Sequence, residues 1–158
     1  MRIAGVIVCA FARVPVKTRY RVSNKADIIE FLAREFPQNA CTVEEVGKAS
    51  AVVKQRIGAD ELRPGGTVSG PVLMWVADLA LYVALLGEIG IVPLAVTTNL
   101  TINFLRKPAA HRSIIGASTL IKVRKVLAVG EVDLFSEGSD DIVAHAVGTY
   151  SIPQKRQD

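Results

Sequence analysis

One long apolar segment that carries a single carboxylate constrains the fold of this chain more than any other feature. Residues 71–86 read PVLMWVADLALYVALL, in which Asp78 is the only ionisable group apart from the weakly acidic phenol of Tyr82. A helix that is apolar on every side must be covered on every side by other elements. Burying a charge costs free energy unless that charge is paired or functional. The segment therefore predicts a buried central helix over about 71–87 with one acid of special importance.

A glycine-rich turn leads the chain into this helix. It reads RPGGTVSG over residues 63–70, and the following Pro71 suits the first turn of a helix, where a missing N–H costs little. A helix N-terminus offers free backbone N–H groups and a partial positive charge. An acid in an apolar wall with such donors nearby indicates acyl chemistry. The structural alternatives are that Asp78 caps a loop or pairs with a buried arginine, and that Ser69 or Gly70 is only an N-cap.

The residues before the turn predict one short helix and one pair of strands. Asn24 is placed to cap a helix over about 25–36, whose apolar stripe is expected to contain Ile28, Ile29, Phe31, Leu32 and Phe36. Two strands follow over about 41–47 and 49–57, joined tightly around Gly47-Lys48.

After the helix, the period of the apolar residues changes to two. A long strand is expected to bury one face, formed by Leu94, Val96, Thr98, Leu100, Ile102 and Phe104. Further strands are predicted over about 112–122, 126–135 and 141–152. Arg124-Lys125 and Gly138-Ser139 mark the hairpin turns between them.

The length of 158 residues is that of one domain with a substantial core, and half of the residues are hydrophobic. We expect a basic N-terminal extension over 1–22 and a single folded domain over 23–158. The predicted order is a helix, two strands, the long apolar helix and four strands. An antiparallel sheet wrapped around the central helix buries that helix on all sides, so the sequence predicts an α+β fold.

The formal net charge of +4 favours an anionic partner, such as a phosphate-bearing group, nucleic acid or a membrane surface. Much of it lies in the first 25 residues, which hold basic side chains and no acid: Arg2, Arg13, Lys17, Arg19, Arg21 and Lys25. These basic residues form a tail and not a patterned face with interleaved aromatic residues, which argues against nucleic acid as the partner. A helix of about 16 residues would span roughly 24 Å, short of the roughly 30 Å core of a bilayer. We therefore expect no membrane span.

The cysteines and histidines are isolated from one another in the sequence. Cys9 and Cys41 form no metal-spaced pair and no disulfide framework, which predicts a reducing, cytoplasmic location. His111 and His145 stand alone as well, so neither a metal site nor a Ser-His-Asp triad is predicted. The alternative for the segment IAGVIVCAFA, after Arg2, is a signal peptide, but its apolar core is short and only one charge precedes it.

Three stretches resemble the hotdog-fold acyl-CoA thioesterases of the PaaI-like, phenylacetate-pathway type. They are RPGGTVSGPVLMWVADLALYVALLG, LAVTTNLTINFLRKP and VAHAVGTYSI, and the resemblance extends over about residues 24–152. The family's motif is a glycine-containing turn, then His-Gly-Gly, then an acid nine residues after the histidine. Here Ser69-Gly70-Pro71 takes the His-Gly-Gly positions, and Asp78 lies nine residues after Ser69. The resemblance implies the hotdog fold, an antiparallel sheet wrapped around one long central helix.

The resemblance also implies a function, the hydrolysis of an acyl-CoA thioester to a free acid and coenzyme A. It assigns Asp78 the role of general base or nucleophile, and it assigns the Gly70 N–H the role of polarising the thioester carbonyl. Thr97 matches a hydroxyl that helps to hold the water. Coenzyme A enters as part of the substrate, with no separate cofactor. The site is expected at the interface of a homodimer, or of a dimer of dimers, with the acid and the glycine from different subunits.

The chain departs from the family motif at the rim of the site. Ser69 replaces the histidine, Pro71 replaces the second glycine, and Arg63 stands at a position that is often asparagine. We expect these three residues to contact substrate, and we expect Arg124 and Lys125 to meet the phosphates of coenzyme A, although charged turns are often only solvated.

The departures leave other interpretations open. One is a hotdog protein that binds acyl thioesters without hydrolysing them, and another is a hydratase, whose usual Asp/His pair finds no match here. Alternation along the long strand places Thr97 opposite the buried face, so that it reaches the site only near a dimer interface. Trp75 and Tyr82 are expected in the core. Tyr82 is one helical turn beyond Asp78, within reach of a hydrogen bond.

Overall fold

The computed structural model describes residues 22–154. Residues 1–21 lie outside this range, and with them nearly all of the predicted basic extension and the whole signal-peptide alternative. The helices are α1 (Lys25–Glu35) and α2 (Gly70–Ile89), with a short 3-10 helix over Ala59–Glu61. The strands are β1 (Cys41–Gly47), β2 (Ser50–Gln55), β3 (Leu62–Arg63), β4 (Thr67–Val68), β5 (Val96–Phe104), β6 (Ile114–Val123), β7 (Leu127–Ser136) and β8 (Ile142–Ser151).

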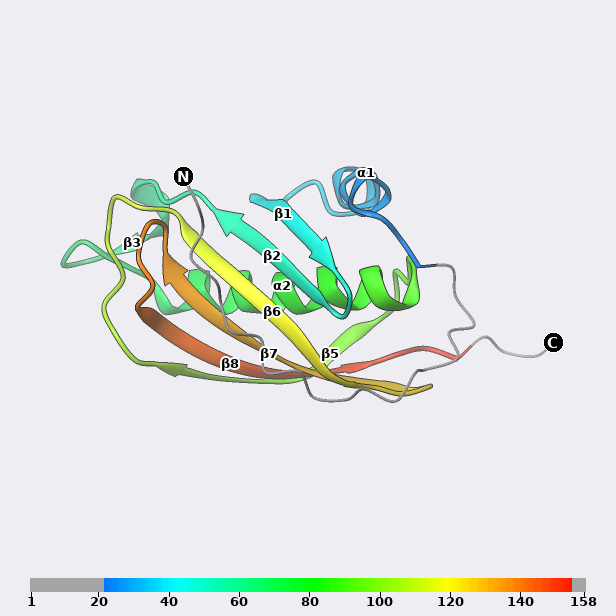
Figure 1. Cartoon of the computed structure of the whole chain (residues 1–158). Helices are drawn as coiled ribbons and strands as arrows, with labels where there is room; N and C mark the ends of the chain where they lie inside the picture. Colours follow the sequence, from blue (N-terminus) through cyan, green and yellow to red (C-terminus); the bar gives the residue numbers. More distant parts are fainter. Residues whose placement is uncertain (1–21, 155–158) are drawn as a thin grey trace.

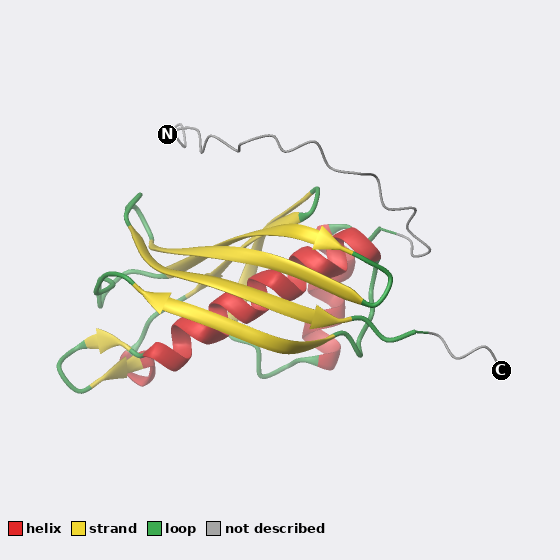
Figure 2. Cartoon of the chain, turned by 90° about the horizontal axis from the view of Figure 1, so that it is seen from below, coloured by secondary structure: helices red, strands yellow, loops and turns green. Residues whose placement is uncertain are grey.

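Six of the strands form one antiparallel sheet in the order β1-β2-β6-β7-β8-β5. The sheet curves around α2, which lies along its concave face (Figure 1), and the view from below shows the helix crossing the strands obliquely (Figure 2). The expected α+β architecture is confirmed, and so are the four sheet strands expected after the helix.

Helix α2 begins and ends at residues that favour helix termini. Ser69 is the N-cap with extended backbone, Pro71 lies in the first turn, and Gly90 ends the helix at a positive φ of 89°. With 20 residues, α2 is longer than expected and is long and apolar enough to cross a membrane. The length argument against a membrane span was therefore wrong. The sheet and α1 instead bury two thirds of the segment, as in a core helix.

The sheet lies close against α2 because glycines face the helix where large side chains project from it. Leu81 is 1% exposed, and a Cβ atom added at Gly148 or Gly130 would lie 2.5 Å or 2.6 Å from its methyl carbons. Ser118, also buried, donates a hydrogen bond of 2.8 Å to the carbonyl oxygen of Ala80 in α2. This contact fixes the middle of the helix against β6.

Helix α1 packs beside α2 and β1, at the same end of the molecule as the end of α2 (Figure 1). The expected cap is confirmed: Asn24 accepts from the N–H of Asp27, and the Asp27 carboxylate accepts from the N–H of Asn24. Ile28, Phe31 and Leu32 are buried as expected. Ile29 was wrongly assigned to the apolar stripe, because it is exposed on the far side of the helix.

The glycine-rich turn is itself a small hairpin, which the sequence analysis treated only as a turn. Strands β3 and β4 pair through Leu62–Val68 and Arg63–Thr67. Gly65 and Gly66 form its tip with φ angles of 91° and 67°, a region that side chains with a Cβ rarely adopt. The hairpin leads directly to the N-terminus of α2.

The prediction that β5 buries one face was wrong for most of the strand, and only Leu100 and Ile102 of that face are partly buried against the core. Val96 and Phe104 are more than half exposed, and no residue of β5 is fully buried. The reason is position: β5 is the last strand of the sheet and pairs only with β8 among the described residues. A bulge between Thr97 and Asn99 also breaks the simple alternation of its side chains.

Candidate active site

Asp78 lies in the middle of α2, beside the end of the sheet where strands β5 and β8 pair. Two hydroxyl groups donate to the same carboxylate oxygen, Oδ1: that of Thr97 at 2.6 Å and that of Tyr150 at 2.7 Å. Tyr150 Oη is also 2.9 Å from the Asp78 carbonyl oxygen. The described residues provide no hydrogen-bond donor to Oδ2, and none of their buried side-chain oxygens lacks a partner. The second carboxylate oxygen is therefore accessible from solvent.

Asp78 faces a cavity of about 440 Å³ between α1, α2 and the start of β5. Five of its lining residues are aromatic, from α1 and its C-cap, from α2 and from β8: Phe31, Phe36, Trp75, Tyr82 and Tyr150. The Phe36 and Trp75 rings lie 5.2 Å apart, and the Tyr82 and Tyr150 rings stack at 6.1 Å. Such a wall suits an apolar group, and the carboxylates of Asp78 and Glu35 also line the cavity.

The sequence prediction for the two aromatic residues of α2 needs correction. Trp75 is not a core residue, since it is 36% exposed, whereas Tyr82 is half-buried and packs against the core as expected; both line the cavity. The Tyr82 hydroxyl donates to the carbonyl oxygen of Pro93 at 3.4 Å and makes no bond to Asp78. Burial raises the pKa of Tyr82 to about 12, so its hydroxyl stays protonated at neutral pH.

Tyr150, which the sequence analysis missed, is the tyrosine that binds Asp78. The pattern along β8 carries a signal for it. The inward-facing residues are Ala144, Ala146 and Gly148, and then the large Tyr150. A phenol among small inward-facing residues indicates a position where a strand side chain extends to a polar group on the facing element.

Thr97, expected to reach the site only near a dimer interface, needs no second subunit to reach Asp78. It bonds Asp78 within one chain. Thr97 and Tyr150 are paired residues on the adjacent strands β5 and β8, immediately before the bulge in β5. The bulge brings Thr97 onto the face of the sheet that already carries Tyr150, so that both hydroxyls point toward α2.

Gly70 lies at the N-terminus of α2, where its N–H has no acceptor within the helix. The Phe104 ring covers it: a Cβ atom added at Gly70 would lie 3.3 Å from that ring. Eight residues separate Gly70 from Asp78, which is about 12 Å along the helix axis. Within one chain, the N–H and the carboxylate therefore cannot contact the same carbonyl group.

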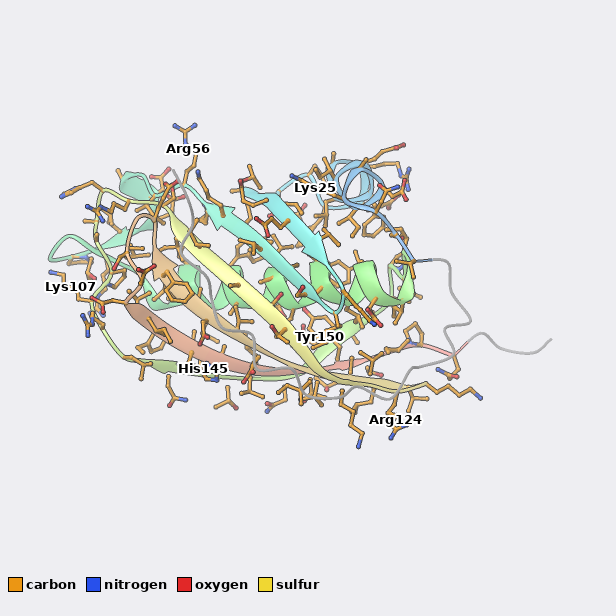
Figure 3. The ribbon with its side chains drawn as sticks, in the orientation of Figure 1. Lys25, Arg56, Lys107, Arg124, His145 and Tyr150 are labelled. Atoms are coloured by element: carbon orange, nitrogen blue, oxygen red, sulfur yellow. The ribbon has the colours of Figure 1, made fainter. Side chains whose placement is uncertain are left out.

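The remaining predicted site residues fall into two groups. Arg63, Ser69 and Pro71 lie with Gly70 around the N-terminus of α2, with Arg63 and Pro71 exposed. Ser69 makes no side-chain cap bond. Arg124 and Lys125 are exposed at the β6–β7 turn, and Figure 3 shows Arg124 at the opposite end of the molecule from Lys107. The assignment of all five residues to substrate binding stays a prediction.

Cys41 is buried and hydrogen-bonded, so it does not join the site. Its thiol donates to Gln55 at 3.1 Å, and burial raises its pKa to about 12. Across residues 22–154, no group of three His, Cys, Asp or Glu side chains is close enough to share a metal ion.

Comparison with known proteins decides the family. Residues 65–143 match the model of the thioesterase superfamily. The fold superposes on a candidate thioesterase from Silicibacter sp. TM1040 with a TM-score of 0.78 and 38% sequence identity, covering 84% of this chain and 94% of that chain. The chain belongs to the thioesterase superfamily.

Other solved structures show the same architecture at lower identity. A point mutant of the phenylacetic acid degradation protein PaaI from Thermus thermophilus superposes with a TM-score of 0.65 and 23% identity, covering 78% of this chain and 99% of that chain. A Streptococcus mutans UA159 protein, solved with acetyl-CoA bound, gives a TM-score of 0.65 and 18% identity over 75% of this chain and 93% of that chain. These likenesses establish the hotdog fold. No curated protein matches the sequence.

Proposed function

We propose that this chain is an acyl-CoA thioesterase, which hydrolyses an acyl-CoA thioester to a free acid and coenzyme A. The observation that carries the proposal is the environment of Asp78. Its carboxylate is held by two hydroxyl groups at the edge of an apolar cavity, while its second oxygen stays accessible. An acyl group fits the aromatic wall, and its carbonyl then lies at the cavity edge beside the acid.

The carboxylate supplies the chemistry in two proton transfers. Asp78 takes a proton from water as the water oxygen attacks the thioester carbonyl carbon. The tetrahedral intermediate then breaks its carbon–sulfur bond, and the leaving thiolate takes up the proton from Asp78. Thiolates leave readily, so the acid needs no histidine partner. Direct attack by Asp78, which gives an anhydride that water then opens, is the other route open to a carboxylate.

The negative charge on the intermediate needs a donor, and residues 22–154 of Asp78's own chain place no free backbone donor beside the acid. The Gly70 N–H is a free donor at a helix N-terminus, which suits an oxyanion. Because it lies about 12 Å from Asp78 along α2, we assign this donor to a second subunit. The site then takes its acid from one chain and its N–H from the partner.

Strand β5 offers an interface that would bring these two groups together. Its edge is unpaired among the described residues and carries the exposed apolar side chains of Val96, Phe104 and Leu105. Antiparallel pairing of two β5 strands about a two-fold axis at Leu100 sets Val96 of one chain opposite Phe104 of the other. Within each chain, Phe104 lies over Gly70, and Thr97, the residue after Val96, binds Asp78. Pairing Val96 of one chain with Phe104 of the other would therefore bring the partner subunit's Gly70 toward Asp78, in a homodimer or a dimer of dimers.

Coenzyme A fits the charge of the chain as the carrier of the acyl group. The net charge is +4, and the Streptococcus mutans relative of the same fold binds acetyl-CoA. We assign Arg63, Ser69 and Pro71 to the rim around the thioester, and Arg124 and Lys125 to the phosphates. A cytoplasmic location, where coenzyme A thioesters and reduced cysteines occur together, belongs to this proposal.

The test is thiol release from short, long and aromatic acyl-CoA esters by the wild type and by Asp78→Asn. We expect release by the wild type and a loss of a hundredfold or more in the variant, about 3 kcal/mol of transition-state stabilisation. Equal release by both proteins would remove Asp78 from the mechanism. Ester binding without release by the wild type would favour the alternative that Ser69 and Pro71 suggest, a non-catalytic acyl-thioester-binding protein.

A further inference from the structure

Tyr150 lies where no sequence motif places a functional residue, and its contacts are specific. It is 4% exposed, its ring stacks on Tyr82, and its hydroxyl is 2.7 Å from Asp78 Oδ1. Figure 3 shows it in the interior of the domain, between the sheet and α2. A buried phenol needs a hydrogen-bond partner, and the two acceptors within its reach are both atoms of Asp78.

The sheet holds the two donors to Asp78 as a pair. Thr97 and Tyr150 lie opposite each other on β5 and β8, and both hydroxyls converge on Oδ1. Because two donors occupy one oxygen, the rotation of the carboxylate is fixed. Oδ2, which has no described donor, is left for the reacting water or carbonyl.

We propose that Tyr150 is a positioning residue of this site, whose hydroxyl orients the Asp78 carboxylate and stabilises its ionised form. The proposal rests on the proposed function for its kinetic readout, while the hydrogen bond itself is testable without turnover. The Tyr150 hydroxyl bonds the acid, so the effect of removing that hydroxyl passes through Asp78.

The protonation state of Tyr150 suits this role. Burial and, after it, the negative charge of Asp78 raise the pKa of Tyr150 well above its usual range, so the hydroxyl remains a donor throughout any practical assay. The other ionisable groups that line the cavity are Tyr82 from α2 and Glu35 from α1. Glu35 is exposed and paired with Arg34 at 2.8 Å.

The experiment compares Tyr150→Phe with the wild type in kcat, KM and the pH dependence of kcat/KM. The variant keeps the ring and removes only the donor. Loss of a donor to the carboxylate disfavours its charged form, so activity is expected to be lost at a higher pH on the acid side of the profile. We expect the acid limb to move up by about one pH unit, and kcat to fall on the order of tenfold with little change in KM.

Two control variants separate this effect from general damage. Ser118→Ala removes the other buried hydroxyl that bonds α2, and it does not touch the carboxylate. Tyr82→Phe removes the hydroxyl of the stacked neighbouring ring, which bonds Pro93. Both are expected to keep the acid limb of the wild type. An equal shift in either control, or no shift in Tyr150→Phe, would overturn the proposal.

Two further measurements keep the test decisive. If Tyr150→Phe does not fold, Thr97→Val removes the paired donor and is expected to move the acid limb in the same direction. Infrared difference spectra between each protein and its Asp78→Asn counterpart follow the protonation of Asp78 without substrate. If no ester is hydrolysed, the proposed function fails, but the infrared midpoint still decides whether Tyr150 acts on Asp78.

Discussion

The two sides of α2 are equally apolar in sequence and differ in what covers them. Val76 and Leu81 on the sheet-facing side are at most 1% exposed, under close contact from glycines of the sheet. On the other side, Met74 and Trp75 are more than a third exposed, and Trp75, Asp78 and Tyr82 line the cavity. An apolar pattern thus predicts that a helix is buried. It does not predict which side of the helix is covered by the chain's own sheet and which side is left for a ligand or a second copy of the chain.

The sheet-facing side accounts for the largest expected change in stability. Leu81→Ala removes the side chain that fills the space over Gly130 and Gly148. We expect the free energy of unfolding to fall by about 4 kcal/mol, measured by urea denaturation. A loss below about 1 kcal/mol would mean that this side of α2 is not the closely packed one.

The helix N-terminus allows a matched pair of variants that isolates one N–H group. Gly70→Pro removes the donor and suits a first helical position after the extended Ser69, whereas Gly70→Ala keeps the donor. Both add a Cβ near the Phe104 ring. We expect kcat of the proline variant to fall on the order of 100-fold below that of the alanine variant, as for loss of one oxyanion donor. Equal rates for the two variants would exclude the Gly70 N–H.

The variant Gly148→Ala tests how closely the sheet packs against the helix. The new Cβ would lie 2.5 Å from a methyl carbon of Leu81, so side chain or backbone must move. We expect a loss of about 2 kcal/mol in unfolding free energy. Combining this change with Leu81→Ala should cost clearly less than the sum of the two single changes, because the second removes the atoms that the first displaces. Additive losses would contradict direct packing between these residues.

The smallest expected effect is that of Ser69→Ala. The Ser69 side chain makes no cap bond, so the unfolding free energy should change by less than about 0.5 kcal/mol. A change in KM for acyl-CoA esters then reports contact with substrate and not damage to the helix. An unchanged KM would remove Ser69 from the substrate-binding group.

Most of the fold was predictable from local patterns, because the apolar segment around Asp78 and the turn residues act over short distances. The Asn24 cap, the hairpin turn at Arg124-Lys125 and the central helix needed no knowledge of tertiary contacts. The exposure of β5 was not predictable in this way. Alternation predicts that a strand has an apolar face, and only the sheet order places β5 at an edge.

The candidate site was predicted only where a residue stands out in the local sequence pattern. Asp78 stands out as a charge in an apolar helix, and Gly70 follows from the start of that helix. Tyr150 is separated from Asp78 by 72 residues, and the two meet only because β8 crosses the middle of α2. The bulge that turns Thr97 toward Asp78 leaves no clear trace in the sequence of the strand, VTTNLTINF.

The central claim is that the cavity-facing side of α2 is half of an active site, completed by the partner subunit's Gly70. Its most direct test is a purified heterodimer of one Asp78→Asn chain and one Gly70→Pro chain, assayed by thiol release from acyl-CoA. The account predicts that each variant homodimer is nearly inactive, and that the heterodimer, with one intact site of two, recovers about half of the wild-type rate. A heterodimer as inactive as the two homodimers would contradict it, because the acid and the N–H would then have to come from one chain.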